Sequence, residues 1–273
     1  MTPKVLGIFG VGLIGGSIGL RARRNGLEVF GYDPDPSALE QARVAGAIDA
    51  VASFDELPHR ADVLVIAAPL GATLDEIERL RERGDALCAL MLDVASVKAP
   101  VVAAARGLKN FVASHPMAGS ERSGASNARG DLFEGRPWAY APTGDAQLDA
   151  RACTFIVSLG ALPLAIGAED HDRIVAIASH VPQVVAFRYA RLLREEPGAE
   201  KLCGPVAREL LRIASMDPAM WREILSANAT NVESDLRRLA AELAVAADEL
   251  AAPVAQIKAP AGAMERGPGA ERP

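Results

Sequence analysis

The 273-residue sequence has only three cysteines, and they form no pairing pattern. Cys88, Cys153 and Cys203 are odd in number, widely spaced and without a CxxC motif. This excludes a disulfide-based secreted domain, and we expect buried thiols in a reducing compartment. Aromatic residues are also scarce, at 4% of the chain against 50% hydrophobic residues. This composition is typical of an ordinary soluble protein rich in helix.

Positive charge is in deficit, with 29 Lys and Arg residues against 35 Asp and Glu residues and a net charge of −6. A general affinity for nucleic acid or for anionic membranes is therefore excluded. No stretch is long and apolar enough to span a bilayer, and no cleavage site follows the apolar N-terminus. We expect a cytoplasmic protein, in which an anionic substrate needs a local basic site.

Short apolar runs alternate with helical patterns over the first two thirds of the chain. This alternation predicts right-handed crossovers and a mostly parallel sheet, an α/β fold. The predicted strands are 5–10, 28–33, 62–69, 89–95, 110–114, 137–142 and 162–167. The predicted helices are 14–25, 36–46, 71–83, 97–107, 120–130 and 145–160.

Strand signals stop near residue 168, and helical periodicity continues to residue 250. We therefore expect a nucleotide-binding domain over 1–167 and a helical domain over 168–250. One long helix there is apolar enough to be shared between the two copies of a homodimer. The segment 251–273 is rich in proline and without periodicity, which predicts a disordered tail.

A glycine-rich turn joins the first predicted strand to the first helix. The sequence Gly10-Val11-Gly12-Leu13-Ile14-Gly15 has the GxGxxG spacing of dinucleotide-binding loops. Gly10 allows a tight turn, Gly12 allows a pyrophosphate to approach the backbone, and Gly15 allows close helix packing. Free N–H groups at the helix N-terminus, including those of Leu13 and Ile14, favour phosphate binding.

The second predicted strand ends at Asp33, which is the position that contacts the adenine ribose in such folds. A carboxylate there accepts from a ribose 2′-hydroxyl and repels a 2′-phosphate, and no Lys or Arg follows it. NAD is therefore favoured over NADP. Two further strand ends carry small residues that would let the nicotinamide half approach, and Ala68, Pro69 and Asp93 are our candidate cofactor contacts there.

Ser96 follows Asp93 closely, and its residue type supports two interpretations. A serine before a predicted helix over 97–107 is a good N-cap. It is also a candidate for the active site, because ligands bind at the carboxyl ends of parallel strands. The two roles coexist only if the cap does not use the hydroxyl.

Five motifs together identify the chain as similar to the prephenate and arogenate dehydrogenases, which make the tyrosine precursor. They are GVGLIGGS (10–17), DVASVK (93–98), HPMAGSERSG (115–124), HD followed by SHVPQ (171–172 and 179–183), and LRIASMDPAMWREILSAN (211–228). The resemblance implies a Rossmann domain followed by an all-helical dimerisation domain. It also implies NAD-dependent oxidative decarboxylation of a cyclohexadienol acid, prephenate to 4-hydroxyphenylpyruvate or arogenate to tyrosine.

The resemblance also assigns roles to individual residues of this sequence. His115 matches the histidine that takes the proton of the substrate ring hydroxyl, and Ser96 matches the serine that bonds this hydroxyl or orients the histidine. Arg212 matches the arginine that holds a substrate carboxylate, with Glu209 one turn before it as an ion-pair partner. Glu121 is implied at the edge of the site, as a substrate-binding residue.

The helical region contributes four further polar positions. His171-Asp172 and His180 match the family, but their spacing does not place both histidines on one helix face, so no metal site is expected. His180 is a candidate substrate contact, with a structural role across the domain interface as the alternative. Many relatives have a histidine where this chain has Gln183, so Gln183 leaves the choice between prephenate and arogenate open.

Two other functions remain as alternatives to the dehydrogenase. Another Rossmann-plus-helical reductase, of the β-hydroxyacid or pyrroline-carboxylate type, would need a lysine on a helix of the second domain or no catalytic side chain. The only lysines after residue 168 are Lys201 and Lys258, in a charged loop and in the tail. A non-catalytic NAD-binding sensor would be indifferent to His115.

Overall fold

The computed structural model describes residues 3–83, 88–120 and 122–251. A six-stranded parallel sheet forms the N-terminal half, in the order β3-β2-β1-β4-β5-β6. Its strands are nearly continuous apolar runs, which is expected where helices cover both faces of a sheet. The strands are β1 (Val5–Phe9), β2 (Glu28–Tyr32), β3 (Ala50–Val51), β4 (Val63–Ile66), β5 (Leu90–Asp93) and β6 (Phe111–Val112).

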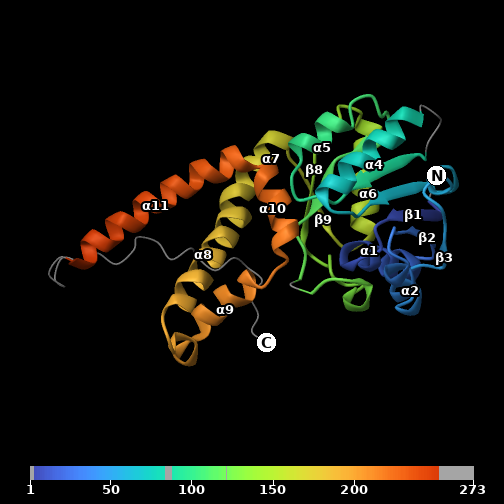
Figure 1. Cartoon of the computed structure of the whole chain (residues 1–273). Helices are drawn as coiled ribbons and strands as arrows, with labels where there is room; N and C mark the ends of the chain where they lie inside the picture. The colour runs from blue at the N-terminus through green and yellow to red at the C-terminus, as the bar shows by residue number, and fades with distance from the viewer. Residues whose placement is uncertain (1–2, 84–87, 121, 252–273) are drawn as a thin grey trace.

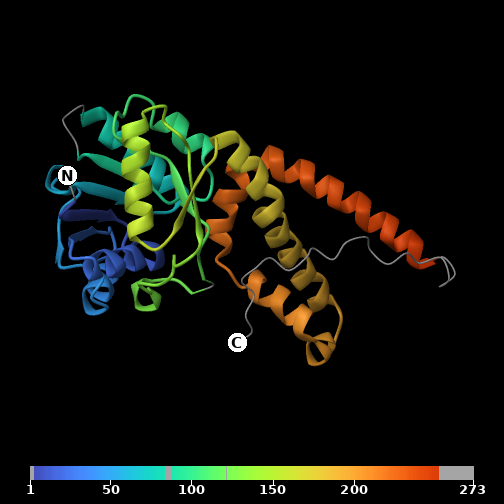
Figure 2. The same cartoon turned by 180° about the vertical axis from the view of Figure 1, so that it is seen from behind.

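Helices pack on both faces of this sheet and divide the core into two layers (Figures 1 and 2). Residues of α1 and α6 pack on one face against Leu6 and Ile8, while α4 and α5 pack on the other against Phe9 and Leu64. The helices are α1 (Leu13–Arg24), α2 (Pro36–Val44), α3 (Leu57–Arg60), α4 (Leu70–Arg83), α5 (Ala99–Ala104) and α6 (Ala146–Ser158). This is the α/β architecture that the alternating pattern predicts.

A second, three-stranded sheet that the sequence does not predict carries His115. It consists of β7 (Ser114–Pro116), β8 (Pro137–Tyr140) and β9 (Leu162–Ala165), with β7 and β8 antiparallel. The predicted strand 110–114 is in fact two strands, since β6 ends at Val112 and β7 begins at Ser114. His115 therefore lies inside a strand, opposite Ala139, and not at a strand end.

The predicted helix over 120–130 is wrong. Among the described residues of this segment, only Ala125–Asn127 form a helical turn, of the 3₁₀ type. Gly124 precedes this turn with a φ of +85°, a left-handed conformation that an α-helix cannot include. The alternation of small polar residues with glycine thus favours a loop across this segment.

From Ala168 onward the described chain is helical. The elements are α7 (Ala168–Val175), a π-helical turn η2 (Ala176–His180), α8 (Val181–Glu195), a 3₁₀ turn η3 (Ala199–Leu202), α9 (Pro205–Ala214), α10 (Pro218–Ala227) and α11 (Ala229–Ala251). Gly167 is the N-cap of α7, the first of these helices. The predicted disordered tail lies outside the described residues from 252 onward.

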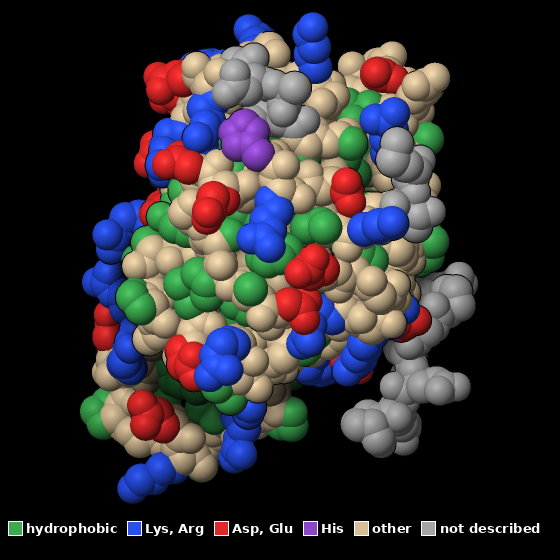
Figure 3. Space-filling view, turned by 90° about the vertical axis from the view of Figure 1, so that its right-hand side faces the viewer, with side chains coloured by type: hydrophobic (Ala, Val, Ile, Leu, Met, Phe, Trp, Pro, Cys, Tyr) green, Lys and Arg blue, Asp and Glu red, His purple; other side chains and the backbone are tan. Residues whose placement is uncertain are grey.

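The helical part projects away from the parallel sheet, and α11 extends furthest from it (Figures 1 and 2). The two parts meet where α10 packs near α4, with the Gly71 N–H donating to Glu223 at 3.2 Å. No helix in the described parts of the chain has both the length and the apolar content to cross a bilayer. Figure 3 shows Lys and Arg side chains interspersed with Asp and Glu over the face at the N-terminal end.

Candidate active site

The loop between β1 and α1 has the shape that its glycines predict. Gly10 has a φ of +86°, and a Cβ there would lie 2.5 Å from the carbonyl oxygen of Ala67. A Cβ on Gly15 would lie 2.0 Å from the carbonyl oxygen of Gly10. A Cβ on Gly12, in contrast, would have no atom within 4 Å. Gly10 and Gly15 are thus required by the fold, whereas Gly12 leaves open space beside the backbone.

The N-terminus of α1 borders this open space. Gly12 is the N-cap, and no side chain caps the helix. The first N–H groups of α1, which include those of the half-buried Leu13 and Ile14, therefore remain for a ligand. Positive partial charge at a helix N-terminus suits a phosphate group.

Two acidic side chains stand near the end of β2. Asp33 accepts hydrogen bonds from the N–H groups of Val11 at 3.1 Å and Asp35 at 3.0 Å. Burial raises the pKa of Glu76 to about 7, with the Arg79 cation opposing this shift and the charge of Asp33 adding to it. One carboxyl oxygen of Glu76 is buried without a described partner. Acidic side chains here disfavour the ribose 2′-phosphate of NADP. Glu76 belongs to no motif by which the sequence could have identified it.

The other predicted cofactor contacts lie at the carboxyl ends of β4 and β5. Ala68 is half-buried and its carbonyl accepts from the Thr73 hydroxyl at 3.0 Å, while Pro69 is exposed beside it. Asp93 is fully buried. Its carboxylate accepts from the N–H of Ala95 at 2.9 Å and is paired with Lys98. These bonds occupy the Asp93 carboxylate and leave its side chain no group for the predicted cofactor contact.

The buried Asp93–Lys98 ion pair holds β7 in place. Lys98 is 1% exposed and its ammonium also donates to the carbonyl of Ser114 at 2.6 Å. The Ser114 N–H donates to Asp93 at 2.8 Å, and its hydroxyl donates to the Asp93 carbonyl at 2.6 Å. Trp138 Nε1 donates to the same hydroxyl at 3.0 Å. Every polar group of Ser114 is thus fixed, and this residue directly precedes His115.

His115, on β7, is the first of three side chains linked in a row. The other two, His171 and Asp172, lie on α7. Nδ1 of His115 lies 3.0 Å from Nε2 of His171, and Nδ1 of His171 lies 2.7 Å from Oδ1 of Asp172. Asp172 also accepts from the N–H groups of Lys98 at 2.7 Å and Ala99 at 2.8 Å, so it caps α5 from the helical domain. His171 and Asp172 match the family in sequence, but the sequence assigns them no role in the site.

The surroundings of His115 favour its neutral form. Its desolvated environment lowers the pKa of His115 well below the ordinary value, and the positive charge of Lys98 lowers it further. The side chain is half-buried, so part of the ring remains accessible. Because Nδ1 faces His171, Nε2 is the ring nitrogen left for a ligand. A neutral, partly accessible imidazole can act as a general base.

Ser96 does not cap a helix. It is half-buried in the loop after β5, and α5 begins later, at Ala99, with Lys98 as the N-cap residue. The carboxylate of Asp172 takes the capping role, as described above. In the described part of the chain the Ser96 hydroxyl has no hydrogen-bond partner, so nothing there competes with the substrate role predicted for it.

His180 lies in the π-helical turn and is 1% exposed. Its Nδ1 is 3.1 Å from Nδ2 of Asn228, which also donates to the carbonyl of Asp172 at 2.7 Å. Burial lowers the pKa of His180 to about 4. These contacts favour the structural interpretation of His180, as part of the interface around Asp172, over a direct substrate contact.

Two of the remaining predicted substrate contacts lie on the neighbouring helices α8 and α9. Gln183, on α8, is 2% exposed and donates from Nε2 to the carbonyl of Ile213 at 2.9 Å. Arg212, near the end of α9, forms the expected ion pair with Glu209. Its Nη2 lies 2.6 Å from Oε1 of Glu209. The Arg212 side chain is 47% exposed and hence accessible to an anion. Glu121 lies outside the described residues.

Comparison with known proteins places the chain in a family. The sequence profile of the prephenate dehydrogenase nucleotide-binding domain matches residues 18–160, and that of the prephenate dehydrogenase dimerization domain matches residues 167–256. The chain belongs to the prephenate dehydrogenase family. The family resemblance, the nucleotide-binding fold and the helical second domain expected from the sequence are thereby confirmed.

Two curated relatives and one solved structure show the extent of the likeness. The chain is 37% identical over 245 residues to the probable prephenate dehydrogenase NovF of Streptomyces niveus, and 34% identical over 235 residues to the prephenate dehydrogenase of Bacillus subtilis. These matches cover 87% and 80% of this chain, and 66% and 62% of the relatives. The chain therefore spans slightly less than two thirds of these prephenate dehydrogenases.

Among solved structures, the prephenate dehydrogenase of Aquifex aeolicus, in complex with hydroxyphenyl propionate and NAD+, superposes with a TM-score of 0.83. The match covers 92% of each chain at 27% identity. Both domains of this chain therefore have counterparts in one solved member of the family.

Proposed function

We propose that this protein is an NAD-dependent dehydrogenase that oxidatively decarboxylates prephenate, arogenate or both, in tyrosine biosynthesis. The observation that carries the proposal is the His115–His171–Asp172 chain, which holds a neutral imidazole beside the strand ends that carry the dinucleotide loop. In open parallel sheets, this carboxyl edge is where ligands bind. Membership of the prephenate dehydrogenase family supports the same reaction.

The residues of the dinucleotide loop fit NAD. Gly12 leaves room for a pyrophosphate, the uncapped N-terminus of α1 offers N–H groups, and Asp33 stands at the ribose position. Ala68 and Pro69 border the nicotinamide side. When bound, NAD supplies an acceptor for a hydride. The NAD+ bound in the Aquifex relative supports this choice of cofactor.

His115 supplies the proton acceptor of the reaction. Its Nε2 takes the proton of the ring hydroxyl while a hydride leaves the same carbon, and the hydroxyl becomes a carbonyl. The bond between the opposite ring carbon and its carboxylate then breaks, CO₂ leaves, and the electron pair makes the ring aromatic. We expect Ser96 to bond the same hydroxyl. Proton transfer of this kind contributes about 10²–10⁴-fold in rate.

Asp33 is expected to determine the preference for NAD over NADP. In Asp33→Ala, the ribose loses a charged acceptor worth about 1.5–3 kcal/mol, and a 2′-phosphate loses part of its repulsion. We expect kcat/KM for NAD to fall about tenfold or more, and the NAD-to-NADP ratio to fall with it. An unchanged ratio of the two kcat/KM values would exclude Asp33 from the ribose site.

Arg212 is expected to bind a substrate carboxylate. A guanidinium pairs with a carboxylate through two charge-assisted hydrogen bonds, worth about 1.5–3 kcal/mol. Arg212→Gln should therefore raise KM for substrate about 10- to 100-fold with a smaller change in kcat and none in NAD affinity. Glu209→Gln is the matched control, because it removes the Glu209 charge and keeps the guanidinium. A KM in Arg212→Gln equal to that of the unmodified enzyme would remove Arg212 from the site.

Gln183 is expected to contribute to the choice between the two substrates. Because Nε2 donates to the Ile213 carbonyl, the amide oxygen is the group left to accept a hydrogen bond. An acceptor suits the ammonium of arogenate better than the keto group of prephenate. Gln183→Leu should lower kcat/KM for arogenate about tenfold and that for prephenate less. A larger loss with prephenate would reverse this assignment.

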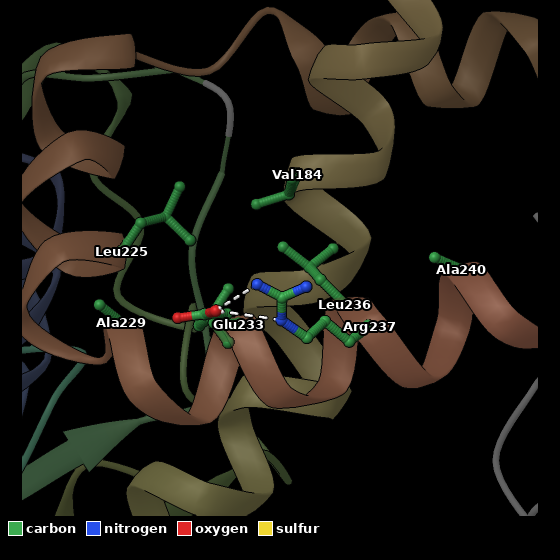
Figure 4. Close-up of a pocket in the computed structure, with 8 residues that line it drawn as sticks. Val184, Leu225, Ala229, Glu233, Leu236, Arg237 and Ala240 are labelled. Atoms are coloured by element: carbon green, nitrogen blue, oxygen red, sulfur yellow. Dashed lines mark hydrogen bonds and ion pairs between the residues drawn. The ribbon is translucent and has the colours of Figure 1, made fainter.

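A second copy of the chain is the expected partner of the helical domain. A hollow of about 410 Å³ lies between α8 and α11 (Figure 4). Its lining is mainly apolar and also includes the Glu233–Arg237 ion pair. The apolar residues are Val184, Leu225, Ala229, Val232, Leu236 and Ala240. The match of this region to a dimerization domain supports a homodimer in which the partner covers this surface.

Turnover with NAD and each substrate tests the proposal. Purified protein should form NADH from NAD when prephenate or arogenate is added in separate reactions. NAD binding without turnover of either substrate would favour a sensor. Turnover of a β-hydroxyacid or of pyrroline-carboxylate in their place would favour a reductase of that type.

A further inference from the structure

The His171–Asp172 pair is buried and joins the helical domain to His115. His171 is 2% exposed and Asp172 is 3% exposed. The rings of His115 and His171 meet edge to face, with centroids 5.2 Å apart and an interplanar angle of 73°. This arrangement aims Nε2 of His171 at Nδ1 of His115. The two imidazoles are therefore linked through defined nitrogens.

The hydrogen bonds of Asp172 determine where the protons of this chain lie. Its carboxylate accepts from two backbone N–H groups, those of Lys98 and Ala99, so it acts as an acceptor. Nδ1 of His171 must then donate to Asp172. In a neutral imidazole the other nitrogen, Nε2 of His171, carries a lone pair. Nδ1 of His115 must consequently donate, which leaves the lone pair of His115 on Nε2.

We propose that His171 and Asp172 are positioning residues that hold His115 in its Nδ1–H tautomer, with the lone pair on Nε2 facing the substrate hydroxyl. This inference rests on the proposed function, in which Nε2 is the base. The same pair also stabilises the imidazolium that forms when Nε2 takes the proton, because the His171 lone pair and the Asp172 charge face the remaining N–H.

The charges around His115 come from several elements. Lys98 precedes α5, Asp93 ends β5, Asp172 and His171 lie on α7, and His180 lies on η2. Burial has the largest effect on the pKa of His115, and Lys98, His171 and His180 each lower this pKa further. The free base is therefore kept neutral, and its link to the Asp172 carboxylate runs through the hydrogen bonds of His171.

Two substitutions separate the proposed role from a structural one. In His171→Asn, the side-chain amide reaches the place of Nδ1, so the contact with Asp172 is kept and that with His115 is lost. In His171→Gln, the amide reaches the place of Nε2, so an acceptor for His115 is restored. We expect kcat to fall about 10²-fold or more in the Asn variant and to recover at least tenfold in the Gln variant. The NAD Kd and the Tm should stay close to those of the unmodified enzyme in both.

The tautomer can be observed directly by ¹⁵N NMR, because the chain has only four histidines to assign. In labelled full-length protein without substrate, His115 should be protonated on Nδ1, and the Asn variant should lose this preference. A lone pair on Nδ1 of His115 in the unmodified protein would overturn the proposal. So would a kcat in His171→Asn equal to that of the unmodified enzyme, or equal losses in both folded variants. Since the NMR measurement needs no turnover, it decides the tautomer even if neither expected substrate reacts.

Discussion

Replacing His115 with asparagine should lower kcat by about 10²–10⁴-fold. The amide keeps the size and polarity of the side chain but has no lone pair basic enough to take the hydroxyl proton. The dinucleotide loop is formed by β1 and α1, so the NAD Kd should not change. Steady-state NADH formation with saturating substrate measures the first effect, and titration calorimetry with NAD measures the second.

His59→Gln is the matched control for this variant. His59 is exposed on α3, away from the His115 chain, and its replacement should leave both constants unchanged. A kcat in His115→Asn within a factor of a few of the unmodified enzyme would mean that another group takes the proton. A loss of NAD affinity in the same variant would instead indicate that the substitution disturbs the fold.

Lys98→Met should produce the largest loss of stability. The ammonium is buried against the fully buried Asp93, and its removal leaves that carboxylate without a counter-charge. Breaking a buried pair in this way costs about 3–5 kcal/mol. The free energy of unfolding from urea titration measures this loss. Since Lys98 also donates to the carbonyl next to His115, the fraction that remains folded should have a reduced kcat.

Two comparisons show whether the uncompensated charge is the cause. Arg43→Met removes the cation of an exposed pair with Glu40 and should leave the free energy of unfolding nearly unchanged. The double variant Lys98→Met/Asp93→Asn removes both charges and should recover part of the loss. A stability of Lys98→Met equal to that of Arg43→Met would contradict the structural role of the pair.

The sequence predicts those parts of the fold that depend on local pattern. The parallel strands are apolar runs between amphipathic helices, and the loop from Gly10 to Gly15 has a spacing set by steric limits that the structure shows directly. β3 was missed because it has only two residues, Ala50 and Val51. The helix expected over 120–130 does not form because its helical pattern is weak and is interrupted by glycine and small polar residues.

The arrangement around His115 depends on contacts between distant segments, which no local pattern reveals. His115 and His171 are 56 residues apart, and Lys98 and Asp172 are 74 residues apart. The sequence places Ser96 before α5 and so suggests it as the N-cap. In the structure the carboxylate of Asp172, from the helical domain, caps this helix. The adjacent His171 and Asp172 at the start of the helical domain are the sequence signal for the hydrogen-bonded row that ends at His115.

The central claim is that hydride transfer and loss of CO₂ occur in one reaction on one substrate. The most direct test measures NADH and CO₂ together, with purified protein, NAD and the better of prephenate and arogenate. We predict that the two products form in equal amounts and that an aromatic product appears with them. Formation of NADH without CO₂, as from a simple alcohol dehydrogenase, would contradict the account.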